Sequence, residues 1–369
     1  MSTQIATYQP QKILNVKRHC DGGWFWTKYS AYPYLGCYYG CLYCYEWDKK
    51  YTPFKNPLGF DKQILIKENA AEILAQELVN KPIDLIMLGD WQPVEQKYRL
   101  SRAMLKVTSE LGFPVFINEK SPLVVRDLDL LATINQKSYA NIGFSIITTQ
   151  DDATRKIFEP KAPSVQSRFS AMAKIADAGI MTGTVFMPIL PFIYDNEKNI
   201  QAVVRMTKDA GGKYVLAGNL TLFGYCKERY YQALKTLDPD LIARYDNLYR
   251  DHNAWQHHYR TIAKLVESYC QKYHLDYQIP RPVNFFPKKI RVNKLIAEQI
   301  YSQVRSLQFQ SDNYYQVQAF LKVANNIDET ATDILTLYEQ EGFDGLKKFP
   351  GVGNKMAAVL ERVIINFKK

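Results

Sequence analysis

The stretch YPYLGCYYGCLYCYEW, residues 32–47, holds three of the six cysteines of the chain within eight residues. Cys37, Cys41 and Cys44 follow the spacing C-x3-C-x2-C, with glycines and aromatic residues around them. Thiolates select zinc or iron–sulfur centres, and a structural zinc site normally takes four protein ligands. Three thiolates from one loop suit three corners of an iron–sulfur cube, which leaves the fourth iron open to a small molecule.

Two other interpretations of the three thiols stay open at this point. Zinc is one of them, because Cys20 or His19 is available as a fourth ligand. The other is a chance grouping of structural thiols, since free cysteines are common in protein interiors. We favour the iron–sulfur cluster, because it explains why no fourth thiol stands near the other three.

Length, charge and apolar runs limit the class of protein. The 369 residues are 47% hydrophobic, enough for one large domain with an appendage or for two domains. The net charge of +10 suits a polyanionic partner or a basic but inert surface. The apolar runs are too short to cross a membrane, and the N-terminus has no apolar signal core. We therefore expect a cytoplasmic protein without membrane contact, where clustered cysteines usually bind metals rather than form disulfides.

Strand-like apolar runs alternate with segments of helical spacing from about residue 30 to residue 222. We expect strands within residues 29–36, 83–90, 114–121, 141–149, 182–190 and 214–220. This alternation predicts an α/β fold, a partial (β/α)6 barrel of parallel strands with a C-terminal all-helical extension. Reactive groups of such sheets lie at the carboxyl ends of the strands, and the cysteine loop follows the first strand.

Changes in the pattern divide the chain into four expected parts. Residues 1–29 are an irregular N-terminal lead-in, and residues 30–222 form the α/β core. Residues 223–290 are a helical extension that ends in a basic linker rich in proline. Residues 291–369 form a helical domain.

The cysteine spacing, with the aromatic Tyr43 directly before the last cysteine, resembles the signature of the radical S-adenosylmethionine (SAM) superfamily. Residues 89–131, 144–179 and 186–196 resemble the branch that contains spore photoproduct lyase. The resemblance runs in order from about residue 30 to residue 222, so the α/β core is expected to be a radical SAM core.

The resemblance implies a chemistry that begins at the cysteines. A [4Fe–4S] cluster is held by Cys37, Cys41 and Cys44, and SAM chelates the free iron through its amino and carboxylate groups. The cluster cleaves SAM reductively to a 5′-deoxyadenosyl radical, which takes a hydrogen atom from a substrate. No flavin or nicotinamide fingerprint follows a strand, so an external one-electron donor of the flavodoxin or ferredoxin type is implied.

The resemblance also implies which residues contact SAM. Tyr43 lies against the adenine, and Gly89 and Asp90 stand where the family holds the SAM amino group. Asp90 replaces the glutamate-bearing pattern that is usual there. Ser145 and Arg168 contact the ribose or the carboxylate of SAM. The alternative for this last pair is a strand hydroxyl and a solvated helix face.

One departure from the family concerns the hydrogen donor. Spore photoproduct lyase needs a cysteine thiol in its substrate cavity, but this chain has no cysteine between Cys44 and Cys226. We therefore expect a different radical reaction from repair of spore photoproduct. Cys226 is either a replacement hydrogen donor or a buried inert thiol.

The stretch FDGLKKFPGVGNKMAAVLERVI, residues 343–364, resembles a helix-hairpin-helix motif. In that family the hairpin grips the backbone of DNA, which implies phosphate contacts at Gly351, Gly353, Lys348 and Lys355. Free backbone N–H groups at a helix start and nearby lysines suit an anion. The alternative is a helix pair used for packing or for docking a protein.

These observations lead to one functional hypothesis and two alternatives. The leading hypothesis is a radical SAM enzyme of the lyase or transferase type that acts on nucleic acid, in DNA modification or repair. The first alternative is a radical SAM enzyme that modifies a protein or a small molecule, with the hairpin used for docking. The second is a non-catalytic DNA-binding metalloprotein.

Overall fold

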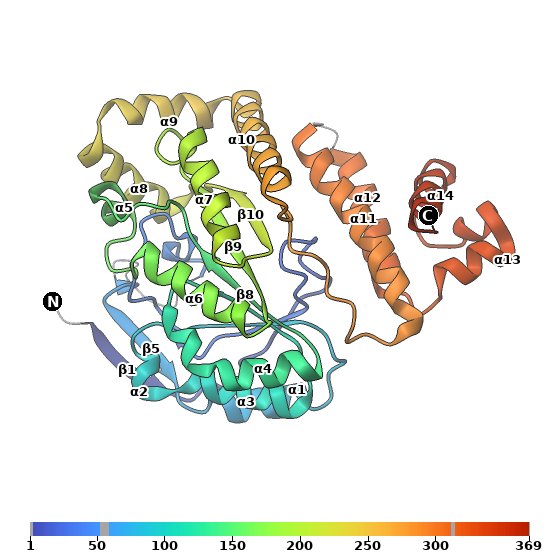
Figure 1. Ribbon diagram of the computed structural model, residues 1–369, viewed down its shortest axis with the longest axis horizontal. Coiled ribbons are helices and arrows are strands. Elements are labelled where there is room, and N and C mark those ends of the chain that lie inside the picture. The colour runs from blue at the N-terminus through green and yellow to red at the C-terminus, as the bar shows by residue number, and fades with distance from the viewer. Residues whose placement is uncertain (1–2, 52–58, 311–313, 369) are drawn as a thin grey trace. The chain divides into compact units, whose positions relative to one another are not determined.

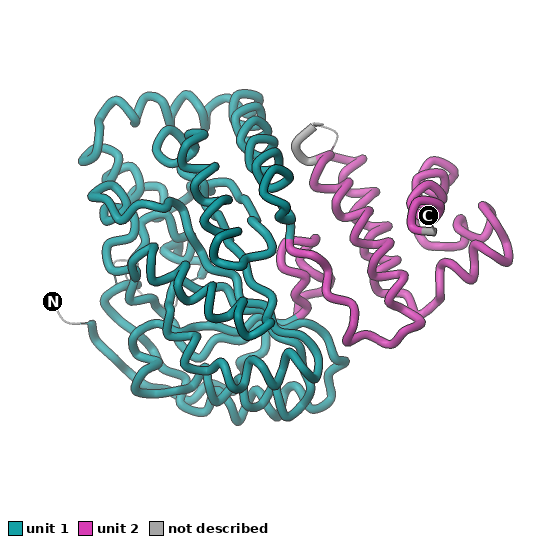
Figure 2. The backbone as a smooth tube through the Cα atoms, viewed as in Figure 1, with its two compact units in different colours: residues 1–15, 29–278 teal, residues 16–28, 279–369 magenta. Residues whose placement is uncertain are grey.

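The computed structural model describes residues 3–51, 59–310 and 314–368. It divides into two compact units, with residues 1–15 and 29–278 in unit 1 and residues 16–28 and 279–369 in unit 2 (Figure 2). This division differs from the boundaries expected at residues 29, 222 and 290. The lead-in is shared between the units, and the helices that follow residue 222 stay with the α/β unit.

A parallel sheet forms the centre of unit 1 (Figure 1). Its six parallel strands are β3 (Tyr29–Ala31), β6 (Ile86–Leu88), β7 (Val115–Glu119), β8 (Ala140–Ser145), β9 (Met181–Ile189) and β10 (Tyr214–Asn219). They lie side by side in chain order, and the short β2 (Asn15–Val16) ends the row after β3. The predicted α/β fold with parallel strands and a C-terminal helical region is confirmed.

Helices cover this sheet because their apolar faces pack on strands that are buried on both sides. The helices between the strands are α1 (Ala70–Leu78), α2 (Glu95–Tyr98), α3 (Leu100–Leu111), α4 (Leu128–Lys137), α5 (Ala153–Phe158), α6 (Val165–Asp177) and α7 (Glu197–Asp209). All six residues of β8 are buried, as is usual for a central parallel strand. Figure 1 shows α6 and α7 lying against the sheet, where α6 contacts β8 and β9 and α7 contacts β9 and β10.

A second, smaller sheet was not expected from the sequence. It contains β1 (Gln4–Tyr8), β5 (Gln63–Lys67) and β4 (Tyr34–Leu35), in that order. Residues 29–36, expected as one strand, are divided between β3 and β4 in different sheets. Pro33 lies at the division, where it has no N–H to donate and its carbonyl accepts from Lys67 N at 2.9 Å. The expected irregular lead-in likewise contains a strand, β1.

Three helices complete unit 1 after the last strand: α8 (Gly224–Leu237), α9 (Asp240–Arg250) and α10 (His252–Tyr273). Buried tyrosines fix them to the strand ends. Tyr245 on α9 donates to the carbonyl of Pro191 at 2.6 Å and meets Tyr230 on α8 at 2.8 Å between hydroxyl oxygens. The turn after β9 is thereby held against α8 and α9.

Unit 2 consists of α11 (Lys288–Gln310), α12 (Tyr314–Glu329), α13 (Ile334–Leu346), α14 (Asn354–Lys368) and the N-terminal segment 16–28. Trp26 anchors that segment, because its ring packs edge-on against Tyr301 at 5.7 Å and its indole N–H donates to Ile279 O at 2.8 Å. Asp328 pairs with Arg281 at 2.5 Å and with Lys294 at 3.3 Å. The expected basic linker is therefore packed structure rather than a solvated tether, since Ile279, Arg281 and Lys294 are buried.

None of the helices in the described part of the chain combines the length and apolar character that crossing a membrane requires.

Breaking the charge cluster of unit 2 gives a stability prediction. Asp328→Ala leaves two buried cations without their carboxylate, and we expect the free energy of unfolding to fall by about 3 kcal/mol. Urea denaturation followed by circular dichroism measures the change. Asp344→Ala is the control, because its side chain is 81% exposed and its pair with Lys347 is a surface pair worth less than about 1 kcal/mol. Equal losses for the two variants would contradict the prediction.

Candidate functional site

The cysteine loop leaves β4 and is fixed by backbone hydrogen bonds to distant segments. Cys37 N donates to Phe60 O at 3.0 Å, and Leu42 N donates to Phe158 O at 2.9 Å. These bonds hold the two ends of the loop, one beside the segment before β5 and the other at the end of α5. The path of the loop therefore depends on the folded core around it.

Side chains and a glycine shape the loop between these anchors. The indole N–H of the buried Trp47 donates to Cys41 O at 2.8 Å. Gly40 has a φ of 61°, and a Cβ there would lie 3.0 Å from the Cβ of Asp61. Only glycine meets both conditions without strain. These contacts fix the conformation of the loop and therefore the positions of its cysteines.

The three cysteines are free thiols in one electrostatic environment. Burial raises the pKa of Cys37, and the nearby Asp90, Cys41 and Cys44 raise it further. Burial also raises the pKa of Cys41, whereas the charge of Lys120 lowers it. Each thiolate therefore opposes the ionisation of the others, and a positively charged iron–sulfur centre relieves that repulsion. The donor set of three close, apolar-packed thiols fits a cluster with one free iron.

The other possible ligands of the sequence analysis lie elsewhere in the described structure. Cys20 and His19 belong to unit 2, where Cys20 donates to Tyr301 Oη at 3.3 Å and His19 lies 3.0 Å from Glu329. Within the described residues, no three His, Cys, Asp or Glu side chains converge on the position of a single metal ion. A four-iron cluster does not need such convergence, since each thiolate binds a different iron.

Cys226 lies beside the cysteine loop. Its side chain is fully buried against Trp47 and Phe60, next to Cys37 and Cys44, and its thiol points to Leu42 O at 3.9 Å. Burial raises the pKa of the Cys226 thiol to about 11. These surroundings match the buried-thiol interpretation, and its use as a hydrogen donor stays a prediction.

Gln92, in the loop after β6, ties the cysteine loop to the main sheet. Its amide oxygen accepts from Tyr38 N at 2.9 Å, and its amide nitrogen donates to Gly36 O at 3.0 Å. The same nitrogen donates to Asp90 at 2.6 Å. Gln92 is completely buried, so these hydrogen bonds are shielded from water. Gln92 lies two residues after Asp90, but the sequence analysis assigned it no role.

Asp90 is close enough to Cys37 for its charge to raise the pKa of that thiol, and its contact with the SAM amino group stays a prediction. Its backbone is fixed by Ser101, whose hydroxyl accepts from Asp90 N at 3.0 Å and donates to Asp90 O at 2.7 Å. Burial raises the pKa of the Asp90 carboxyl well above its usual value, and the charge of Glu119 raises it further. Gly89 before it packs against Tyr32, where a Cβ would approach the ring to 2.9 Å. The two residues form the wall beside Cys37.

Lys120 directly follows β7 and places a positive charge near Cys41 of the cysteine loop. Its ammonium donates to Ser145 Oγ at 2.8 Å and lies 5.5 Å from the centre of the Tyr43 ring. Its charge also lowers the pKa of Cys41 against the effect of burial. Lys120 thus contacts both Ser145 and Tyr43, two of the residues predicted to contact SAM. The sequence analysis did not name Lys120, although its position directly after a strand is typical of a site residue in such a sheet.

Glu159, at the end of α5, joins the remaining predicted residues. It accepts hydrogen bonds from the Tyr43 hydroxyl, from Arg168 and, at 3.2 Å, from Arg155. Burial alone would raise its pKa, but the charges of Arg168 and Lys120 outweigh burial and lower it to about 2. Glu159 is therefore an internal anion that fixes Tyr43 and the surrounding cations.

Burial decides against one of the two interpretations that the sequence analysis gave for Arg168. The solvated helix face is wrong, because Arg168 is completely buried. Its guanidinium donates to Ser145 O at 2.9 Å and to Pro163 O at 2.8 Å, besides Glu159. A direct contact with SAM stays a prediction. The observed contacts make Arg168 a positioning residue for Ser145 and Glu159.

Comparison with known proteins agrees with this geometry. Residues 32–204 match the model of the radical SAM superfamily. This segment is similar to radical SAM domains. Members of the superfamily use a [4Fe–4S] cluster and SAM, and the three free thiols of the loop fit the cluster. The remaining chain, which includes all of the C-terminal hairpin, lies outside the matched residues.

Similar proteins support the domain without defining a substrate. An uncharacterized protein of Mycobacterium tuberculosis is 27% identical over 231 residues, which are 60% of this chain and 67% of that protein. One of Methanocaldococcus jannaschii is 28% identical over 173 residues, 46% of this chain and 64% of that protein. A solved variant of spore photoproduct lyase has a TM-score of 0.52 at 17% identity, covering 73% of this chain and 78% of its own. The likeness to the lyase is one of fold.

The Gln92 contacts give a prediction for cluster retention. Gln92→Leu removes the hydrogen bonds that hold the cysteine loop, and we expect a chelator to extract iron about tenfold faster from the reconstituted protein. Iron release to a ferrous chelator under anaerobic conditions measures this rate. Gln96→Leu is the matched control, since Gln96 is exposed on α2 nearby. The account is contradicted if both variants release iron at the rate of the unchanged protein.

Proposed function

We propose that this protein is a radical SAM enzyme that acts on nucleic acid, with its C-terminal hairpin binding the polymer. The observation that carries the proposal is the turn before α14. Gly351 has a φ of 87° and Val352 N donates to Phe349 O at 3.1 Å, so the chain turns sharply into the helix. The first backbone N–H groups of a helix have no partner within it and favour an anion.

The charges around this turn support a phosphate ligand. Lys355, in the first turn of α14, is exposed and makes no ion pair with any described residue. Lys348 is also exposed but pairs with Glu341 at 2.5 Å. Unit 2 has 16 lysines and arginines against 10 aspartates and glutamates, so it carries +6 of the net charge of +10. Basic surfaces of this kind attract nucleic acid without reading its sequence.

The chemistry is proposed for the site in unit 1. When bound there, the reduced cluster supplies one electron that cleaves SAM to a 5′-deoxyadenosyl radical. Cys37, Cys41 and Cys44 would hold the cluster. The electron would come from an external one-electron donor of the flavodoxin or ferredoxin type.

The protein's own residues would orient SAM and keep water away. Lys120 lies 3.9 Å from Glu159 and donates to Ser145, and we assign its ammonium to the SAM carboxylate, with Tyr43 beside it. The apolar side chains of Ile147 and Leu190 pack in the same cluster as Tyr43. Such a lining protects a radical from solvent. Repair of spore photoproduct is not proposed, because the substrate-cavity cysteine of the lyase has no counterpart before Cys226.

The role of Lys120 leads to a binding prediction. Lys120→Gln removes the charge but keeps a polar side chain, and we expect the affinity for SAM to fall about tenfold. Equilibrium binding to the cluster-loaded protein measures the affinity, and the iron content reports whether the cluster is retained. Lys161→Gln is the control, since Lys161 is an exposed lysine paired with Asp61. Unchanged SAM affinity with a full cluster would exclude this assignment.

The hairpin lysines lead to a second prediction. The double variant Lys348→Glu with Lys355→Glu should bind duplex DNA at least about tenfold more weakly, and the dependence of log affinity on log salt should flatten by about two. Fluorescence anisotropy at several salt concentrations measures both quantities. Lys81→Glu, an exposed change in unit 1, should leave them unaltered. Equal affinities would instead support a hairpin that docks a protein.

The function itself is tested by turnover. The protein is reconstituted anaerobically with iron and sulfide, reduced with dithionite, and given SAM with or without DNA. We expect 5′-deoxyadenosine to form, to require Cys41 in a Cys41→Ala comparison, and to increase several-fold with DNA. Formation of 5′-deoxyadenosine at the same rate with and without DNA would favour a protein or small-molecule substrate. No formation from a fully loaded cluster would favour the non-catalytic alternative.

A further inference from the structure

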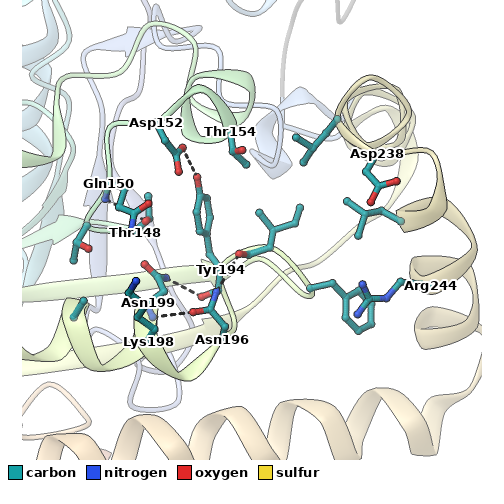
Figure 3. Close-up of a pocket in the computed structure, with 16 residues that line it drawn as sticks. Thr148, Gln150, Asp152, Thr154, Tyr194, Asn196, Lys198, Asn199, Asp238 and Arg244 are labelled. Atoms are coloured by element: carbon teal, nitrogen blue, oxygen red, sulfur yellow. Dashed lines mark hydrogen bonds between the residues drawn. The ribbon is translucent and has the colours of Figure 1, made fainter.

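A cavity of about 450 Å³ opens in unit 1 beside the radical SAM site. Its walls are the turn after β8, the turn between β9 and α7, and α9 with the end of α8 (Figure 3). The first two turns leave the same carboxyl edge of the sheet as Lys120 and Ser145. Tyr194, which lines the cavity, packs in the apolar cluster that contains Cys41 and Tyr43. The cavity therefore borders the reactive end of the fold.

Internal hydrogen bonds connect the segments of the wall and involve the half-buried carboxylate of Asp152. Asp152 accepts from the Tyr194 hydroxyl at 2.9 Å and from Arg155 N at 2.6 Å (Figure 3). Asn199 donates to Tyr194 O at 2.8 Å, and its own N–H donates to Asn196 at 3.0 Å. Both bonds of Asp152 use one carboxylate oxygen, and the exposed Asp238 is a second acidic group of the lining, on the Arg244 side (Figure 3).

Two cations on the wall have no anionic partner among the described residues. Lys198 and Arg244 are exposed, and neither makes an ion pair or hydrogen bond through its side chain with any described residue. Figure 3 places Arg244, from α9, at one end of the cavity and Lys198 toward the other. Lys198 lies in the first turn of α7, a helix of 13 residues whose dipole adds to the positive potential there. Gln150, on the Lys198 side of the cavity (Figure 3), and Thr149 add uncharged polar groups to the lining.

Phe192 is held in an unfavourable conformation on the same wall. Its φ is 63°, a value that residues with a side chain seldom adopt. The guanidinium of Arg244 lies 4.1 Å from the centre of its ring, and Tyr245 packs against it at 5.6 Å. Strain of this kind concentrates where a binding surface is being positioned. The turn after β9 thus places the ring of Phe192 in contact with the guanidinium of Arg244.

We propose that this cavity binds one nucleotide unit of a nucleic-acid strand together with the phosphates on both its sides. Cations at opposite ends match a ligand with two separated anionic groups, and a nucleotide within a strand has a phosphate at its 5′ and its 3′ position. The amide of Gln150 and the hydroxyl of Thr149 can pair with the edge of a base. The volume is in the usual range for a ligand of this size. The identity of the ligand rests on the proposed function.

The smallest probe of this arrangement is a nucleoside 3′,5′-bisphosphate. Its binding to the cluster-loaded protein is measured by calorimetry with SAM at saturation, so that the SAM site does not take up the probe. We expect it to bind about tenfold more tightly than the nucleoside 5′-monophosphate. Arg244→Ala and Lys198→Ala should each remove that advantage. The controls are Arg250→Ala on the same α9 and Lys208→Ala on the same α7, both exposed and outside the cavity.

A short single-stranded oligonucleotide distinguishes a strand from a free nucleotide. Competition between the oligonucleotide and the bisphosphate supports a strand, and binding of the bisphosphate without competition overturns that part of the proposal. If the cavity variants bind both probes as tightly as the controls do, the cavity is not the site. Turnover separates this result from failure of the proposed function. Stimulation of 5′-deoxyadenosine formation by DNA that survives in Arg244→Ala leaves the function standing and rejects the cavity.

Discussion

The site depends on one constraint, that parallel strands laid side by side in chain order must all end at the same edge of the sheet. The segments after β6, β7 and β8 therefore meet, although Asp90 and Ser145 are 55 positions apart in the sequence. Each segment brings one kind of group. The loop after β6 supplies the Gln92 amide, β7 leads to the ammonium of Lys120, and β8 ends on the Ser145 hydroxyl. The cysteine loop closes over this edge and is held there by backbone hydrogen bonds.

Charge in the interior makes this arrangement specific. Glu159 and Arg168 are both fully buried, and a buried pair is tolerated only where its remaining donors and acceptors find partners. Here the Tyr43 hydroxyl, the Ser145 carbonyl and the Pro163 carbonyl complete the set. Any displacement of Tyr43 or of the end of β8 would leave a buried charge incompletely paired. The hydrogen bonds that stabilise the core thus also fix the positions of Tyr43 and Ser145 near the cysteines.

Sequence patterns were sufficient for most strands of the main sheet and for the helices between them, because these depend on short-range spacing. The alternation of strands and helices predicted the parallel sheet, and C-x3-C-x2-C predicted the cluster ligands, but the small sheet of β1, β4 and β5 was missed. Contacts between residues far apart in the sequence could not be predicted from such spacing. Arg168 looks like an ordinary helical arginine until its partner Glu159 is placed, and Gln92 has no pattern of its own. The packing of residues 16–28 on the C-terminal helices, through Trp26 and Tyr301, was also invisible, because nothing local marks a pairing across such a separation.

The central claim is that three thiolates of one loop hold a four-iron cluster whose open iron binds SAM. Electron paramagnetic resonance of the reconstituted, dithionite-reduced protein tests it directly, with and without SAM. The account predicts the signal of a reduced [4Fe–4S] cluster that changes its g-values when SAM is added, and the loss of that signal in Cys41→Ala. A cluster signal that is indifferent to saturating SAM, or one that persists without Cys41, would contradict it.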